Sequence, residues 1–182
     1  MPKLNPLIAA AAFLTFSATA ANAACNMQAA HEWVIDGKQK LSVEAVAEAP
    51  RCPKAVVLLV IRNEKGDALW IEASKARDVF TFAQAKPNGP LTMANALNKW
   101  IAEDARLLKT DFLPEWKMVD DAPEKAANPF YVDEGLSRED YLAMREAKLP
   151  MLCYVAGMES ETCLVLTKDG ILQKIGSLPF AG

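Results

Sequence analysis

The sequence predicts an α+β domain, in which antiparallel strands form a sheet and two to three helices pack on it. Three observations predict this class. Two segments with hairpin signals lie in the first half of the chain, the longest helical pattern lies in the middle, and three strand-like runs separated by turns lie at the end. Helices inserted between antiparallel strands in this order are expected to cover one face of a sheet.

The first 23 residues have the three parts of an export signal. Lys3 supplies a positive charge, residues 7–16 form an apolar run, and Ala21-Asn22-Ala23 is a cleavage site of the A-x-A type. The apolar run is shorter than the ~20 residues that a membrane-spanning helix needs. We therefore expect residues 1–23 to be removed and residues 24–182 to form one domain. The protein is expected to be periplasmic or secreted, without a transmembrane segment.

All four cysteines of the chain follow the predicted cleavage site: Cys25, Cys52, Cys153 and Cys163. An even number in an exported protein favours two disulfides, and four cysteines permit three pairings. We expect Cys25–Cys52 and Cys153–Cys163, because each pair belongs to one local unit. A turn centred on Met158 would place the second pair opposite each other on neighbouring strands. Lipidation of Cys25 is the alternative, and it would leave Cys52 unpaired.

Two hairpins are predicted before the helices. In residues 31–47, Asp36-Gly37 indicates a two-residue turn, and the apolar residues after it alternate as in a half-buried strand. Residues 55–61 are a continuous β-branched and aliphatic run, which is typical of a strand in the centre of a sheet. A turn that contains Gly66 connects this run to a returning strand at residues 68–73.

Helices are predicted in the middle of the chain. Residues 78–85 can form a short helical turn, and residues 92–108 have one apolar face, with Thr92 as the predicted N-cap. Prolines interrupt residues 109–136, which we expect to be an irregular loop. Ser137, with an acidic residue three positions later, then predicts a helix that ends near residue 148.

The C-terminal third predicts a three-strand meander at residues 151–156, 162–167 and 171–178. The last five predicted strands, with the helices inserted among them, resemble PAS-like and profilin-like sheets in their order. This resemblance concerns topology alone, and it implies a pocket between the sheet and its helices without implying a function.

Composition and motifs narrow the function classes. The chain has 20 basic and 23 acidic residues and no basic tract, so we expect no nucleic-acid binding and no attraction to lipid headgroups. No cofactor or metal is expected, because phosphate-binding glycine loops are absent and His31 is the only histidine. We predict no catalytic residue. Ser177 does not lie in the G-x-S-x-G motif of a serine nucleophile. Pairs of adjacent acidic residues in a loop are expected to be solvent-exposed rather than catalytic: Asp120, Asp121, Asp133 and Glu134.

Three aromatic residues of the irregular loop are the predicted binding residues: Trp116, Phe130 and Tyr131. The alternative is that they fold back onto the sheet or a helix. The expected function is that of an exported, non-catalytic binding or accessory protein with an envelope or cell-wall-related protein partner. Inhibition of a cell-wall-degrading enzyme is one form that this function could take. A small-ligand-binding sensory module with a PAS-like pocket and a hydrolase with an unrecognised active site are the two alternatives.

Overall fold

The structure is a computed structural model that describes residues 24–117, 123 and 130–179. The predicted export signal at residues 1–23 lies outside the described residues. The same holds for Asp120 and Asp121 and for most of the chain between Trp116 and Phe130.

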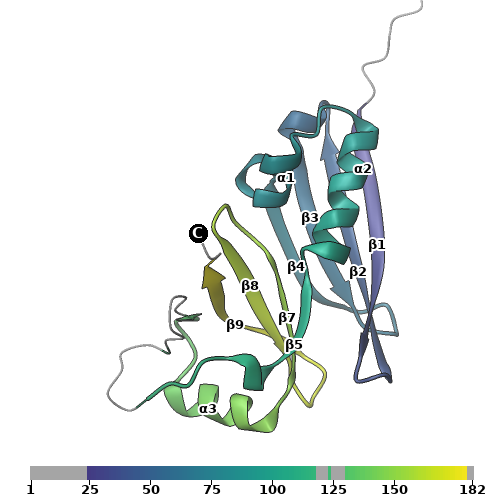
Figure 1. The fold of residues 1–182 in the computed structure, drawn as a ribbon. Helices are drawn as coiled ribbons and strands as arrows, with labels where there is room; N and C mark the ends of the chain where they lie inside the picture. Colours follow the sequence, from purple (N-terminus) through teal and green to yellow (C-terminus); the bar gives the residue numbers. More distant parts are fainter. Residues whose placement is uncertain (1–23, 118–122, 124–129, 180–182) are drawn as a thin grey trace, which may run out of the picture.

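The described strands form two antiparallel sheets, and this confirms the α+β class (Figure 1). Sheet A has the order β1-β2-β3-β4, with β1 (Cys25–Ile35), β2 (Gln39–Ala49), β3 (Val56–Arg62) and β4 (Ala68–Lys75). Sheet B has the order β5-β7-β8-β9-β6, with β5 (Arg106–Lys109), β6 (Tyr131–Val132), β7 (Pro150–Val155), β8 (Ser160–Leu166) and β9 (Leu172–Pro179). The two predicted hairpins and the predicted meander therefore lie in separate sheets rather than in one.

Sheet A is built from the two predicted hairpins. The first turn has three residues rather than two, because Ile35 pairs with Gln39 and the turn closes through a hydrogen bond from the Lys38 amide to the Ile35 carbonyl. Strand β3 lies between β2 and β4, as its unbroken apolar run predicts. The inner face of sheet A is fully buried along β2 and β3: Leu41, Val43, Ala45, Ala47, Val57, Leu59 and Ile61.

Two helices pack on the inner face of sheet A. They are α1 (Phe80–Ala85) and α2 (Pro90–Asn98), and a π-helical turn, η3 (Lys99–Glu103), follows α2. The N-cap of α2 is Gly89, and Thr92 lies one turn into the helix, where its hydroxyl accepts a hydrogen bond from the Gly89 amide. The prediction of Thr92 as the N-cap was therefore wrong, because Pro90 already has the backbone angle of the first helical residue.

The predicted helix at residues 92–108 ends earlier than its apolar pattern indicates. The helical residues end at Glu103, and the carboxylate of Asp104 contacts Lys99 at 2.5 Å and accepts a hydrogen bond from Thr81. The chain then leaves as β5, which pairs with β7 in register Leu107 to Leu152. Non-local pairing with β7 thus overrides a local helical pattern in the last turn of the predicted helix.

Strands β7 and β8 of sheet B are buried on both faces. Alternate residues of β7 and β8 face sheet A, including Leu152 and Leu164, and these belong to a first core that also contains the inner face of sheet A. The other face of sheet B forms a second core with α3 (Arg138–Ala147), which Ser137 caps as predicted. The second core consists of Leu113, Phe130, Leu136, Tyr141, Met151, Cys153, Cys163, Val165 and Ile175.

Both expected disulfides are present. Cys25–Cys52 ties the start of β1 to η1 (Cys52–Lys54), and Cys153–Cys163 joins directly opposed residues of β7 and β8. Because the Cys25 sulfur is bonded to Cys52, it is not available for a lipid anchor in this structure. Among the described residues, no helix is long and apolar enough to cross a membrane.

Candidate functional site

The three predicted binding aromatics differ in their accessibility. Phe130 is fully buried in the second core, where its ring lies 5.9 Å from that of Tyr141. Trp116 is half-buried and meets the same tyrosine edge-on at 5.6 Å. Tyr131 begins the short strand β6 and is 57% exposed. Of the three, only Tyr131 presents most of its side chain to a partner, and Phe130 cannot contact one in this conformation.

The burial of Phe130 has a packing cause. Gly176 of β9 lies directly beneath the Phe130 ring, and a β-carbon there would meet ring atoms at 2.6 and 2.7 Å. The absence of a side chain at Gly176 thus leaves room for a large aromatic ring, whose burial is strongly favourable. Phe130 and Trp116 therefore follow the alternative expected from the sequence, in which these aromatic side chains fold back onto the sheet or a helix.

Of the residues weighed for catalysis or metal binding, His31 lies in sheet A, whereas Ser177 and Asp133 lie near each other at sheet B. His31 is exposed on the edge strand β1, Ser177 is half-buried in β9 opposite Tyr131, and Asp133 forms an ion pair with Lys174 at 3.0 Å. In the described parts of the chain, no three His, Cys, Asp or Glu side chains lie close enough together to hold a metal ion. These residues therefore do not form a common site.

A polar cluster joins the two sheets at the open edge of sheet A. The hydroxyl of Tyr154 accepts a hydrogen bond from the Trp70 indole at 2.9 Å and donates one to the carboxylate of Glu72. Tyr154 is almost completely buried. Burial raises the pKa of the Tyr154 phenol far above its ordinary range, and the neighbouring negative charge of Glu72 raises it further. The cluster holds β4 against β7, which orients sheet B on sheet A.

Tyrosine ionisation tests this arrangement. Burial also raises the pKa of Tyr141, so both phenols titrate above their ordinary pKa of 10.0 in the folded protein. The stability contributed by the neutral phenols is complete below pH 10.0 and is lost as the pH rises beyond it toward the folded-state values. We expect tyrosinate absorbance from Tyr141 and Tyr154 to appear together with the loss of near-ultraviolet circular dichroism. A rise in absorbance from both residues while the dichroism stays native would contradict the arrangement.

The outer face of sheet A carries exposed aliphatic side chains. Helices α1 and α2 and sheet B all pack against the opposite face (Figure 1). Cross-strand register places Val46, Leu58 and Ala73 in one row and Val60 beside Ile71 in the next. Ile71 is 63% exposed and Val56 is 45% exposed. We call this surface the outer patch: Val46, Val56, Leu58, Val60, Ile71 and Ala73.

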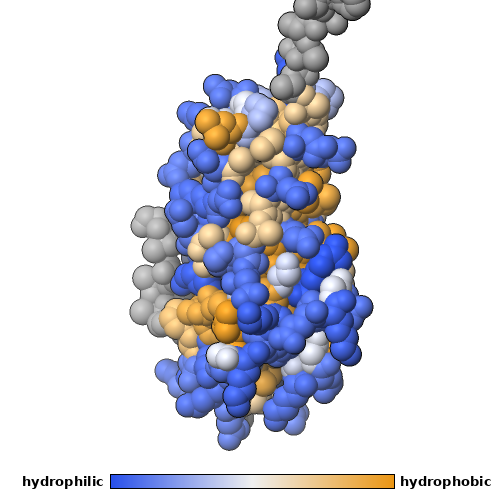
Figure 2. Space-filling view, turned by 90° about the vertical axis from the view of Figure 1, so that its right-hand side faces the viewer, coloured by the Kyte–Doolittle hydropathy of each residue, from blue (hydrophilic) through white to orange (hydrophobic). Residues whose placement is uncertain are grey.

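Charged residues flank the outer patch. Arg62 and Glu44 form an ion pair at 3.3 Å at one end, and Glu48 and Lys75 lie on either side of Val56 at the other. On the side of the molecule that carries β1, hydrophobic residues run down the upper half of the view, with hydrophilic residues on both sides of them (Figure 2). An apolar centre with a polar rim is typical of a protein-binding surface.

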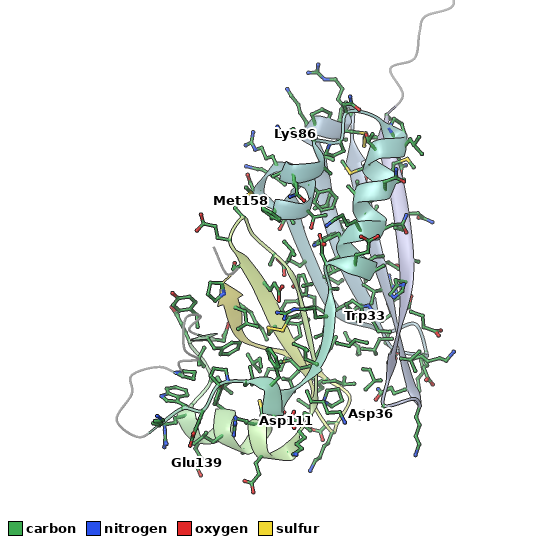
Figure 3. All side chains as sticks on the ribbon, in the orientation of Figure 1. Trp33, Asp36, Lys86, Asp111, Glu139 and Met158 are labelled. Carbon is green, nitrogen blue, oxygen red and sulfur yellow. A yellow bond between two sulfur atoms is a disulfide. The ribbon has the colours of Figure 1, made fainter. Side chains whose placement is uncertain are left out.

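A cavity of about 390 Å³ opens at the end of sheet A where the Cys25–Cys52 bridge lies. Its walls come from η1, from α1 and the two residues that follow it, and from η2 (Ala76–Asp78), which follows β4. Lys86 lies at this end of the molecule, and Asp36 of the β1–β2 turn lies at the other (Figure 3). The volume is within the range of small-molecule sites. The lining residues are Cys52, Pro53, Ala76, Arg77, Phe82, Ala83, Lys86 and Pro87.

Comparison of this chain with protein-family models, with curated proteins and with solved structures found no match.

Proposed function

We propose that this protein is an exported, non-catalytic accessory protein that binds another protein of the cell envelope, and that the outer patch is its docking surface. Export is supported by the signal-like first 23 residues and by the two disulfides, which persist in oxidising compartments. The observation that supports the docking surface is the row of aliphatic side chains on the outer face of sheet A, in which Ile71 is the most exposed large residue.

The position of the outer patch suits docking. Three neighbouring strands supply its side chains, so it is held on a sheet whose other face is fully buried along β2 and β3. Ile71 and Ala73 lie on the edge strand β4, where a partner can reach both the side chains and the strand's outer edge. A partner with an apolar centre and opposite charges facing Glu48 and Lys75 would complement this surface.

Charge reversal on the outer patch tests the proposal. The variant Ile71→Glu with Ala73→Glu places two carboxylates in the apolar centre of the docking surface. Burial of one aliphatic side chain contributes about 1.5–3 kcal/mol, so we expect partner binding to weaken by roughly tenfold to a hundredfold. The measurement is cross-linking in the envelope of the source cells, then purification through a tag on the full chain.

The matched control is Leu91→Glu with Ile171→Glu. Leu91 on α2 is 74% exposed and Ile171 before β9 is 59% exposed, so this control adds the same charge outside the outer patch. The proposal predicts that the control keeps the cross-linked partner and that the outer-patch variant loses it. Equal recovery of the partner by both variants, with both folded, would show that the outer patch is not the docking surface.

A further inference from the structure

The cavity at the Cys25–Cys52 end has a cationic rim and an apolar wall. Its charged lining residues, Arg77 and Lys86, are both basic. Apart from these two side chains the wall is apolar, and it includes Phe82, Pro53 and Pro87. An apolar cavity with charge of one sign at its opening matches a ligand that has an apolar body and one charged end.

A second hollow of about 310 Å³ adjoins this cavity and shares Pro53 and Arg77 with it. Its other charged lining residues are Lys54 and Lys75, so four cations surround the two hollows. Two carboxylates lie beside these four cations: Asp78 is 3.6 Å from Arg77, and Glu48 is the cross-strand neighbour of Val56, which lines the second hollow. This end of the molecule is therefore locally positive, although the whole chain has a formal net charge of −3.

The tertiary fold, not the sequence order, creates this concentration of positive charge. Two short 3₁₀ turns, η1 and η2, lie side by side at the end of sheet A, and α1 brings Lys86 to the same opening. The four cations come from three segments of the chain, with Lys75 and Arg77 in the same one, which is why no basic tract marks them in the sequence.

We propose that this cavity binds a single-chain amphiphilic anion, with the aliphatic chain against Phe82 and Ala83 and the anionic head between Arg77 and Lys86. A fatty acid and a lysophospholipid share this chemistry, since each joins one acyl chain to a carboxylate or phosphate. Arg77 can bind either head group with two parallel hydrogen bonds, and Lys86 adds a second positive charge. The cavity itself shares no lining residue with the outer patch, and only the adjoining hollow reaches it, through Val56.

The test uses dansyl-undecanoic acid as a fluorescent probe of the purified protein, with competition by laurate, by lysophosphatidylglycerol and by uncharged dodecanol. We expect saturable one-to-one binding that the two anions displace and that dodecanol displaces at least roughly tenfold less well, the scale of a hydrogen bond to a charged group. Which of the two anions competes better identifies the preferred head group. Failure of the probe to bind, or equal competition by dodecanol, would overturn the proposal.

Two variants locate the bound probe. Arg77→Glu with Lys86→Glu reverses the charge of the rim, and Ala83→Trp fills the cavity without changing the charge. Both are expected to abolish probe binding. The control Lys65→Glu with Lys168→Glu makes the same charge change in two turns outside the cavity and should leave binding unchanged. Thermal unfolding checks that each variant is folded, and Ala83→Leu replaces Ala83→Trp if the larger side chain prevents folding.

Binding to a bilayer is distinguished by sedimentation with vesicles of phosphatidylglycerol. If the wild-type protein sediments with vesicles but does not bind the monomeric probe, and the folded cavity-filling variant sediments equally well, the cationic end is a membrane-contact surface and the proposal is wrong. If the probe binds normally to Ile71→Glu with Ala73→Glu, the cavity works independently of the outer patch, as proposed.

Discussion

Replacing Gly176 with alanine is expected to destabilise the protein by about 2–5 kcal/mol, because the new β-carbon has no space and the backbone conformation disfavours it. Gly176 has a φ of +152°, a value that residues with side chains rarely adopt. Its β-carbon would lie 2.2 Å from the carbonyl oxygen of Tyr131 and 2.6 Å from the Phe130 ring. The first contact is with the backbone of β6, which cannot move without breaking its pairing with β9.

The free energy of unfolding in urea measures this effect. Gly135→Ala is the control, since no atom lies within 4 Å of the position its β-carbon would take, and we expect a change below about 0.5 kcal/mol. Phe130→Leu combined with Gly176→Ala should recover only part of the loss, because the contact with the Tyr131 carbonyl remains. If Gly176→Ala unfolds at the same urea concentration as the wild type, the packing of Phe130 on β9 is not as described.

The elements that the sequence predicted well are those with strong local signals. The position of the turn at Asp36-Gly37 (though not its length), the capping pair of Ser137 and Asp140, and the aliphatic run of β3 each depend on residues close together in the chain. Errors arose where distant segments decide. Residues 106–108 continue a helical pattern but become β5, because β7 offers an unpaired edge. The division into two sheets likewise follows from burial of β7 and β8 on both faces.

The candidate surfaces depended even more on tertiary structure. Phe130 is surrounded by loop-like sequence, and only Gly176, far along the chain, shows why it is buried. The outer patch is formed by residues that alternate with core residues on β3, so the unbroken apolar run hides which of them face outward. The cations around the two hollows likewise come from three separate segments, which only the fold brings together: Lys54, the pair Lys75 and Arg77, and Lys86.

Removal of the Cys25–Cys52 disulfide is expected to cost about 3.5 kcal/mol of unfolding free energy, and removal of Cys153–Cys163 about 2.7 kcal/mol, on the loop-entropy model. The first bridge spans 27 residues and the second spans 10, so the first restricts the unfolded chain more. Cys153 and Cys163 are fully buried in the second core, so their replacement also removes packing there. Paired alanine variants, unfolded in urea, measure both effects.

Intact mass before and after reduction, with thiol alkylation, provides the covalent control. All four cysteines should gain an alkyl group only after reduction, because both bridges are formed. A mass that includes acyl chains on Cys25 would contradict the Cys25–Cys52 bridge.

The two bridges also differ in the part of the structure that they stabilise. Cys52 lines the cavity at the cationic end, whereas Cys153 and Cys163 lie beneath α3. Loss of Cys25–Cys52 should therefore weaken binding of an amphiphilic anion in addition to lowering stability, whereas loss of Cys153–Cys163 should lower stability and leave binding by the folded protein unchanged.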